Sequence, residues 1–319
     1  MIQVKNLSKW YGPLKAVDSI SFHVREGEIL GFLGPNGAGK TTTLRILTCF
    51  IPASSGAASV AGYDVFTESM RVRQVIGYLP ESVPLYPEMR VREYLNFRAK
   101  LRGLSATDRA AAIDRAARRC RVAEFIDRPI GQLSRGMRQR VGLTEALMHD
   151  PKVLILDEPT VGLDPTQIRE TRNLIKELAK SHTVILSSHI LPEVEATCER
   201  TIIIAAGRIV ASGSPEELKE RITGSSRLIA EIRGPADQVK SAVSQIHGVG
   251  HVEAGLVDGW NRLVIEAKGG QDVREEIFRL TSKNGWALRE MRREVASLED
   301  FFVQITAQQN IAREAPSST

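Results

Sequence analysis

Apolar and polar residues alternate with a period of two over residues 1–33, which is the pattern of β-strands with one buried face. A second pattern, with apolar residues at i, i+3 and i+4, runs through residues 91–148 and again through 171–180, and it predicts helices there. Apolar runs at residues 29–33 and 153–156, and a third at the centre of residues 183–188, are typical of strands that are buried on both faces. Strand and helix patterns that follow one another in this way predict an α/β fold.

The pattern changes near Ser225, where a second series of elements begins. Strands are predicted at residues 228–233, 251–257, 262–267 and 287–291, and helices at 236–246 and 273–283. This order, strand, helix, two strands, helix and strand, is that of a small ferredoxin-like α+β domain. The chain is also longer than the size at which one hydrophobic core stops growing.

We therefore predict two domains. The first covers residues 1–222, with a helical subdomain at about 90–150, and the second is an accessory domain over residues 225–306. A last helix is predicted at residues 297–302, and residues 307–319 are predicted to be a disordered tail. The sequence leaves the role of the accessory domain open between ligand-dependent regulation and dimerisation.

Composition and charge restrict the function only slightly. The chain has 42% hydrophobic and 25% charged residues, as an ordinary globular protein does, and a formal net charge of +5. Such a weakly basic chain is compatible with nucleotides, anionic lipid or nucleic acid. Its three cysteines are far apart and show no metal-ligand spacing, which fits a reducing cytosol. No apolar run approaches the ~20 residues of a membrane helix, and no secretory signal is visible at the start.

The most specific motif is a phosphate loop, G-x-x-x-x-G-K-T, at residues 34–41. A buried strand is predicted before it and a helix after it, so that its backbone N–H groups would surround nucleotide phosphates at the positive end of the helix. Lys40 would lie between the β- and γ-phosphates, and the Thr41 hydroxyl would bind Mg²⁺. The predicted nucleotide-binding residues here are Gly34, Pro35, Asn36, Gly37, Ala38, Gly39, Lys40, Thr41 and Thr42.

An aromatic pair precedes the loop, and it offers a surface for the nucleotide base. Tyr11 is predicted to stack on adenine, with Trp10 as the alternative, because a ring face binds a base without hydrogen bonds. The competing interpretation is that both rings simply pack on the sheet.

Polar residues also follow two of the buried strands. Asp157 and Glu158 end the run at 153–156, at the edge where open α/β sheets bind ligands. A buried pair of carboxylates requires a cation, so Asp157 is assigned to Mg²⁺ and Glu158 to the attacking water. His189 ends the strand at 183–188, and we predict that it contacts the γ-phosphate rather than being a satisfied core histidine.

Two further segments carry candidate functional residues. Ser134 has the position of a helix N-cap, and Gly136 allows a close backbone approach. The loop at residues 82–87 is unusually apolar for a surface connection, and it either folds over the core or forms a docking surface.

Taken in order, these motifs resemble the ATPase subunits of ABC transporters over about residues 1–222. The resemblance implies a P-loop NTPase fold with an antiparallel β subdomain and a helical subdomain. It also implies that two subunits pair head to tail, with each ATP held between the phosphate loop of one and Ser134 and Gly136 of the other. Asp164 would then connect the two sites.

Two positions differ from the usual pattern of the family. Glu81 stands where a glutamine is common, and it can still offer an oxygen to Mg²⁺. The signature reads Leu-Ser-Arg-Gly-Met at residues 133–137 instead of Leu-Ser-Gly-Gly-Gln, which keeps Ser134 and Gly136. Glu81 and the loop at 82–87 resemble the ABC-2-type exporter ATPases, especially those associated with gliding motility.

The resemblance implies an ATPase, with ATP and Mg²⁺, that powers a separate transmembrane exporter. Lys40, Glu158 and His189 would be catalytic, and Thr41, Asp157 and Glu81 would hold the metal. The expected partners are an integral membrane permease and a second ATPase, identical or related, at the cytoplasmic face of the inner membrane.

One alternative is a soluble ABC ATPase that acts on nucleic acid or ribosomes, but neither a second cassette nor heptads appear, so no nucleic acid is expected. Another is a binding module without turnover, which the intact Lys40 and Glu158 oppose.

Overall fold

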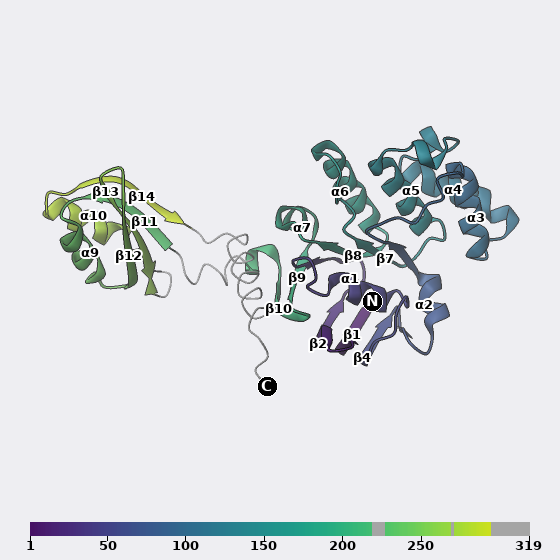
Figure 1. Ribbon diagram of the computed structural model, residues 1–319, viewed down its shortest axis with the longest axis horizontal. Coiled ribbons are helices and arrows are strands. Elements are labelled where there is room, and N and C mark those ends of the chain that lie inside the picture. Colours follow the sequence, from purple (N-terminus) through teal and green to yellow (C-terminus); the bar gives the residue numbers. More distant parts are fainter. Residues whose placement is uncertain (219–226, 269–270, 295–319) are drawn as a thin grey trace. The chain divides into compact units, whose positions relative to one another are not determined.

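The fold is described from a computed structural model of the chain, in which residues 1–218, 227–268 and 271–294 are described. The boundary predicted near residue 222, the helix predicted at 297–302 and the tail predicted at 307–319 lie outside this part of the chain. The chain divides into two compact units, Met1–Pro215 and Glu216–Thr319, and each is described by itself (Figure 1).

The first unit contains an antiparallel sheet built from the alternating N-terminal segment. Its strand order is β2-β1-β4-β5, with β1 Ile2–Tyr11, β2 Leu14–Val24, β4 Ser55–Val60 and β5 Tyr63–Asp64. Ile2 and Val4 of β1 are buried, as the period of two predicts, and Leu7 is buried as well because a register shift between Val4 and Leu7 interrupts the alternation.

A second, six-stranded sheet forms the centre of this unit, with the order β10-β9-β3-β8-β7-β6. The strands are β3 Ile29–Leu33, β6 Ile76–Leu79, β7 Val153–Asp157, β8 Thr183–Ser188, β9 Arg200–Ala205 and β10 Arg208–Gly213. All neighbours pair in parallel except β10, which is antiparallel to β9. Every residue of β3, β7 and β8 is buried, so the carboxyl ends of three adjacent buried strands lie at one edge of the sheet.

Helices connect and cover these strands (Figure 1). They are α1 Lys40–Leu47, α2 Ser69–Val75, α3 Val91–Leu101, α4 Ala106–Arg119, α5 Arg135–Leu147, α6 Pro165–Ala179 and α7 Leu191–Thr197, with short 3-10 turns at Ala123–Phe125 and Ile130–Gln132. The sequence patterns missed α2 and α7. Helix α6 begins six residues before the predicted start at 171, because Asp164 caps it through Gln167 N and Pro165 occupies its first turn.

In its described residues from 227 to 294, the second unit forms a four-stranded antiparallel sheet with two helices. Its elements are β11 Arg227–Arg233, α9 Ala236–Ser244, β12 Val249–Val257, β13 Trp260–Ala267, α10 Arg274–Lys283 and β14 Ala287–Glu294, in the sheet order β12-β13-β11-β14. Apolar residues of both helices and the sheet share one core. Within the described ranges of both units, no helix is long and apolar enough to span a bilayer.

Candidate active site

The phosphate loop lies between the end of β3 and the start of α1. Gly39 has a φ of +106°, and a Cβ at this position would lie 2.5 Å from the carbonyl oxygen of Ala16. At Gly34, a Cβ would lie 2.4 Å from the carbonyl oxygen of Ile204. Both contacts are with backbone, which cannot move aside cheaply, so only glycine allows this path of the loop. The result is a loop whose exposed residues, Asn36 and Gly37, precede the N-terminus of α1.

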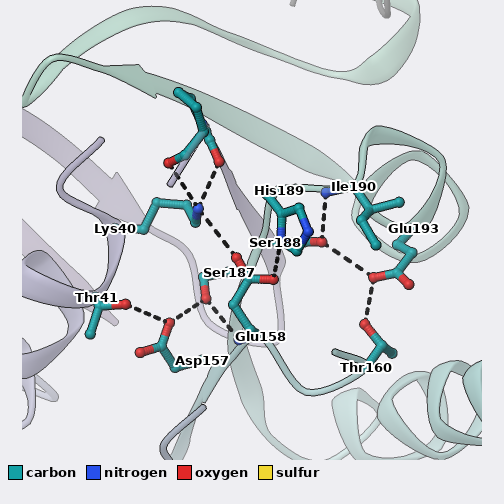
Figure 2. A network of polar contacts seen from close by, with 12 residues as sticks. Lys40, Thr41, Asp157, Glu158, Thr160, Ser187, Ser188, His189, Ile190 and Glu193 are labelled. Carbon is teal, nitrogen blue, oxygen red and sulfur yellow. Dashed lines mark hydrogen bonds and ion pairs between the residues drawn. The ribbon is translucent and has the colours of Figure 1, made fainter. Parts of the chain in front are cut away.

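Lys40 is buried, and its side chain lies among oxygen atoms. Its Nζ donates to the carbonyl oxygens of Gly34 at 2.6 Å and Pro35 at 3.2 Å, and it lies 3.2 Å from Glu158 Oε1 in an ion pair (Figure 2). A buried ammonium group is stable only with such partners. The lysine therefore brings a positive charge to the carboxyl end of β7.

Asp157 is the most buried polar residue of the site. Its Oδ1 accepts hydrogen bonds from Ser187 Oγ at 2.6 Å and from Thr41 Oγ1 at 3.2 Å, while its Oδ2 is buried without a hydrogen-bond partner (Figure 2). Burial raises the pKa of Asp157 although the two hydrogen bonds oppose this, and the charges of Glu158 and Glu81 raise the pKa further. The site thus places a carboxylate beside a hydroxyl in a setting that favours a bound cation.

Glu158 and His189 meet beyond the ends of β7 and β8. Glu158 has a φ of +50°, and its backbone N–H donates to Ser187 Oγ at 2.9 Å. This unusual backbone conformation turns the side chain so that Oε2 lies 2.9 Å from His189 Nδ1 (Figure 2). The imidazole is 38% exposed, whereas the carboxylate is 6% exposed, so the pair opens to solvent on the side of the histidine.

Ser134, Gly136 and Asp164 form a separate group at helices α5 and α6. Ser134 accepts a hydrogen bond from Met137 N at 3.3 Å and caps α5, as predicted, and it is exposed. Gly136 packs against Gln167, since a Cβ at this glycine would lie 2.5 Å from Gln167 Oε1. Asp164 caps α6 through Gln167 N, so the contacts given for these three residues lie within α5 and α6.

Two other predicted residues lie at exposed positions. Tyr11 is 46% exposed, with Lys9 Nζ 5.3 Å from the centre of its ring, so its ring is available to a ligand. Glu81 is exposed and follows β6 after Pro80, near enough to Asp157 for its charge to act on that carboxyl.

Sequence reasoning missed several residues that hold the site together. Ser187 bonds both Asp157 and Glu158, and Glu193 of α7 accepts hydrogen bonds from Thr160 and Ser188. The paired serines at the end of β8 were a usable signal, because strand ends in this fold face the ligand. No such signal exists for Glu193, which lies in a helix of seven residues.

Comparisons with known proteins agree with this fold. The family model described as ABC transporter matches residues 17–161. The chain is 34% identical to the bacitracin transport ATP-binding protein BcrA of Bacillus licheniformis over 312 residues, which cover 96% of this chain and 97% of the relative. It is 38% identical to the Nod factor export ATP-binding protein I of Burkholderia pseudomallei over 239 residues, covering 73% and 77%. The dimeric structure of the ATP-binding cassette MJ0796 bound to ADP and Pi has the same fold, with a TM-score of 0.61, 24% identity and coverage of 67% and 98%.

The chain therefore belongs to the ATP-binding subunits of ABC transporters. It is an ATPase that binds and hydrolyses ATP to power transport, and it is close to the ABC-2-type exporter subunits. None of the relatives named above carries gliding motility in its name, so that finer part of the resemblance is not supported by them.

Proposed function

We propose that this chain is the ATPase of an ABC-2-type exporter and that it works as a head-to-tail pair beneath a separate membrane permease. The observation that carries the proposal is the division of the site into two groups. Lys40, Thr41, Asp157, Glu158 and His189 belong to one polar network, whereas Ser134 accepts a hydrogen bond within α5 and Gly136 packs against Gln167 of α6. A second subunit would bring its own signature segment to complete the nucleotide site, at the cytoplasmic face of the membrane.

The residues fit a magnesium nucleotide. Among the described residues, no group of three or more His, Cys, Asp or Glu side chains could hold a metal alone. Mg²⁺ is commonly held by one or two protein oxygens together with phosphates and water, and Thr41 Oγ1 and the unpartnered Asp157 Oδ2 match that need. The bound ion would neutralise phosphate charge.

The remaining steps belong to the side chains of this chain. Lys40 exchanges its carbonyl partners for phosphate oxygens and stabilises the charge of the transferred group. Glu158 orients the attacking water and takes its proton, and His189 holds the γ-phosphate beside it. Tyr11 stacks on the base.

Glu81 offers a test of the metal assignment. We expect Glu81→Ala to raise the Mg²⁺ concentration for half-maximal hydrolysis about 3- to 10-fold, because an oxygen near the ion is lost. Glu81→Gln keeps an oxygen at the same place and should shift this concentration less than about 2-fold. Titrations of Mg²⁺ at fixed ATP measure both values. If both variants reach half-maximal hydrolysis at the wild-type Mg²⁺ concentration, Glu81 does not belong to the metal site.

Exposed aromatic and aliphatic side chains of the 82–87 loop and of helix α3 form a surface for the permease. Tyr86, Phe97 and Leu101 are 44%, 37% and 64% exposed, and the Tyr86 ring lies 6.1 Å from the Phe97 ring. The loop is also anchored underneath, since Val83 packs against Gly142 of α5. The packing of Val83 supports the interpretation that the loop folds over the core. The exposure of Tyr86 supports the interpretation that the loop forms a docking surface. Clusters of exposed aromatic residues are typical of protein interfaces.

The partner can be captured from gently solubilised membranes with Glu158→Gln and ATP, followed by mass spectrometry. We expect a multi-span membrane protein in near-stoichiometric yield, and a yield at least about 10-fold lower when Tyr86→Ala and Phe97→Ser are added, because interface aromatic residues carry much of the binding energy. Phe66→Ser is the matched control, since Phe66 is 76% exposed on another part of the unit. Capture of ribosomal or DNA-bound proteins without a membrane protein would favour the alternative function.

For the second unit we propose a ferredoxin-like accessory domain. Its elements follow the predicted order, and the sheet places β13 between β11 and β12. Its role in dimerisation or in ligand-dependent regulation is left open by the sequence, and the contacts described within this unit favour neither.

A further inference from the structure

Glu193 lies just outside the catalytic pair and joins the two chain segments that carry it. Its Oε2 accepts a hydrogen bond from Thr160 Oγ1, two residues after Glu158, and one from Ser188 Oγ at 3.2 Å, next to His189 (Figure 2). One carboxylate oxygen thus connects the loop after β7 with the end of β8. The two segments are far apart in the sequence, and their side chains meet at the Glu158–His189 contact.

The connection continues to the backbone around His189. Ser188 Oγ, which donates to Glu193, also accepts a hydrogen bond from Ile190 N at 3.0 Å. The peptide group after His189 is therefore hydrogen-bonded to the side chain of the residue before it. A shift of Glu193 would change the direction in which the imidazole leaves the chain.

Helix α7 holds Glu193 in place by packing. A Cβ at Gly31 of β3 would lie 2.4 Å from Val194 Cγ1 and 3.0 Å from Cys198 Sγ, so the helix rests directly on the backbone of the central strand. Because Val194 is adjacent to Glu193, the carboxylate has little freedom to move.

The burial of Glu193 lowers the stability of the fold, which packing alone would not require. Glu193 is 6% exposed, and its Oε1 is buried without a hydrogen-bond partner. Burying a polar atom in this way lowers stability, and a smaller or apolar residue would avoid the cost. Buried polar atoms without a partner are typical of functional sites, where the geometry that function requires outweighs the loss of stability.

We propose that Glu193 is a positioning residue for ATP hydrolysis, which sets the separation of Glu158 and His189 through Thr160 and Ser188. The inference rests on the proposed roles of Glu158 and His189. We expect its own effect in the chemical step, because both of its hydrogen bonds are to the segments that carry Glu158 and His189.

In the full-length protein, we expect Glu193→Ala to lower kcat about 10- to 100-fold, with the KM for ATP changed less than about 3-fold, since a small misplacement of catalytic groups has effects of this size. Glu193→Gln retains an acceptor oxygen of the same reach and should keep kcat within about 5-fold of the wild type. Thr160→Val and Ser188→Ala each remove one donor and give intermediate losses without removing the carboxylate. Glu199→Ala, an exposed carboxylate just beyond α7, is the matched control.

A double-mutant cycle separates positioning from a general loss of structure. If Glu193 acts through His189, then adding Glu193→Ala to His189→Ala should lower the single-turnover rate less than about 3-fold, because the group it positions is already absent. A full additive loss in that background would overturn the inference, and so would a Glu193→Ala enzyme with wild-type kcat.

Glu158→Gln, measured in parallel, distinguishes failure of the positioning role of Glu193 from failure of the role proposed for Glu158. If Glu158→Gln stops hydrolysis while Glu193→Ala is fully active, only the positioning role is wrong. If Glu158→Gln itself hydrolyses ATP at the wild-type rate, the assigned role of Glu158 is wrong, and the positioning role that rests on it fails as well.

Discussion

Glu158→Gln is expected to lower ATP hydrolysis at least about 100-fold, because an amide cannot accept the proton of the attacking water. The change preserves the size of the side chain, and the backbone contacts of residue 158 with Ser187 do not involve the carboxylate. The substitution removes the charge that Glu158 contributes to its ion pair with Lys40, but Lys40 keeps the carbonyl oxygens of Gly34 and Pro35 as partners, and the Thr41–Asp157 hydrogen bond does not involve residue 158. The variant should therefore bind ATP as the wild type does and retain it unhydrolysed.

Phosphate release and retention of labelled ATP measure the two halves of this prediction. Glu177→Gln serves as the control, because Glu177 is an exposed carboxylate on α6 whose loss should leave the rate within about 2-fold. Hydrolysis by Glu158→Gln within a few-fold of the wild type would show that another group activates the water.

Ser134→Asp is expected to abolish ATP-dependent pairing of subunits and to lower hydrolysis about 100-fold or more, since it places a negative charge opposite the γ-phosphate held by the partner. Aspartate is as good an N-cap as serine, so the start of α5 should keep its cap and the fold its stability. Ser134→Asn adds similar bulk without charge and should have a smaller effect. Sedimentation with ATP, in the Glu158→Gln background, measures the pairing.

A mixing experiment tests whether Ser134 acts across the interface. Lys40→Ala and Ser134→Asp should each be inactive alone. Mixed in equal amounts, they form some pairs in which the Ser134→Asp subunit supplies an intact phosphate loop and the Lys40→Ala subunit an intact signature. Recovery of part of the wild-type activity is expected. Failure to recover any, while mixed pairs form, would place Ser134 in the site of its own subunit.

The phosphate loop shows why part of the site can be predicted from sequence. Its glycines, Lys40 and Thr41 lie within eight consecutive residues between a strand and a helix, so local geometry alone places them together. The ends of the buried strands were equally visible, because the apolar run of β7 stops at Asp157 and that of β8 is followed by Ser187, Ser188 and His189.

Helix α7 shows the limit of such reasoning. Its seven residues are too few for a helical period to stand out, and its stability comes from packing on Gly31. Glu193 was missed with it. Helix α6 was placed six residues late for a related reason, since its first turn depends on a cap by Asp164 and not on an apolar face.

The sequence by itself determined the phosphate loop, the strand ends that bear Asp157, Glu158 and His189, and the order of the elements described in the second unit. Only the tertiary structure decided which of these ends are neighbours, because the strand order β3-β8-β7 is not the order along the chain. That arrangement brings Lys40 to Glu158, Thr41 to Asp157 and Glu193 to both catalytic segments. The physical reason is that local patterns record burial and dihedral preference, whereas contacts between distant segments depend on how the whole core packs.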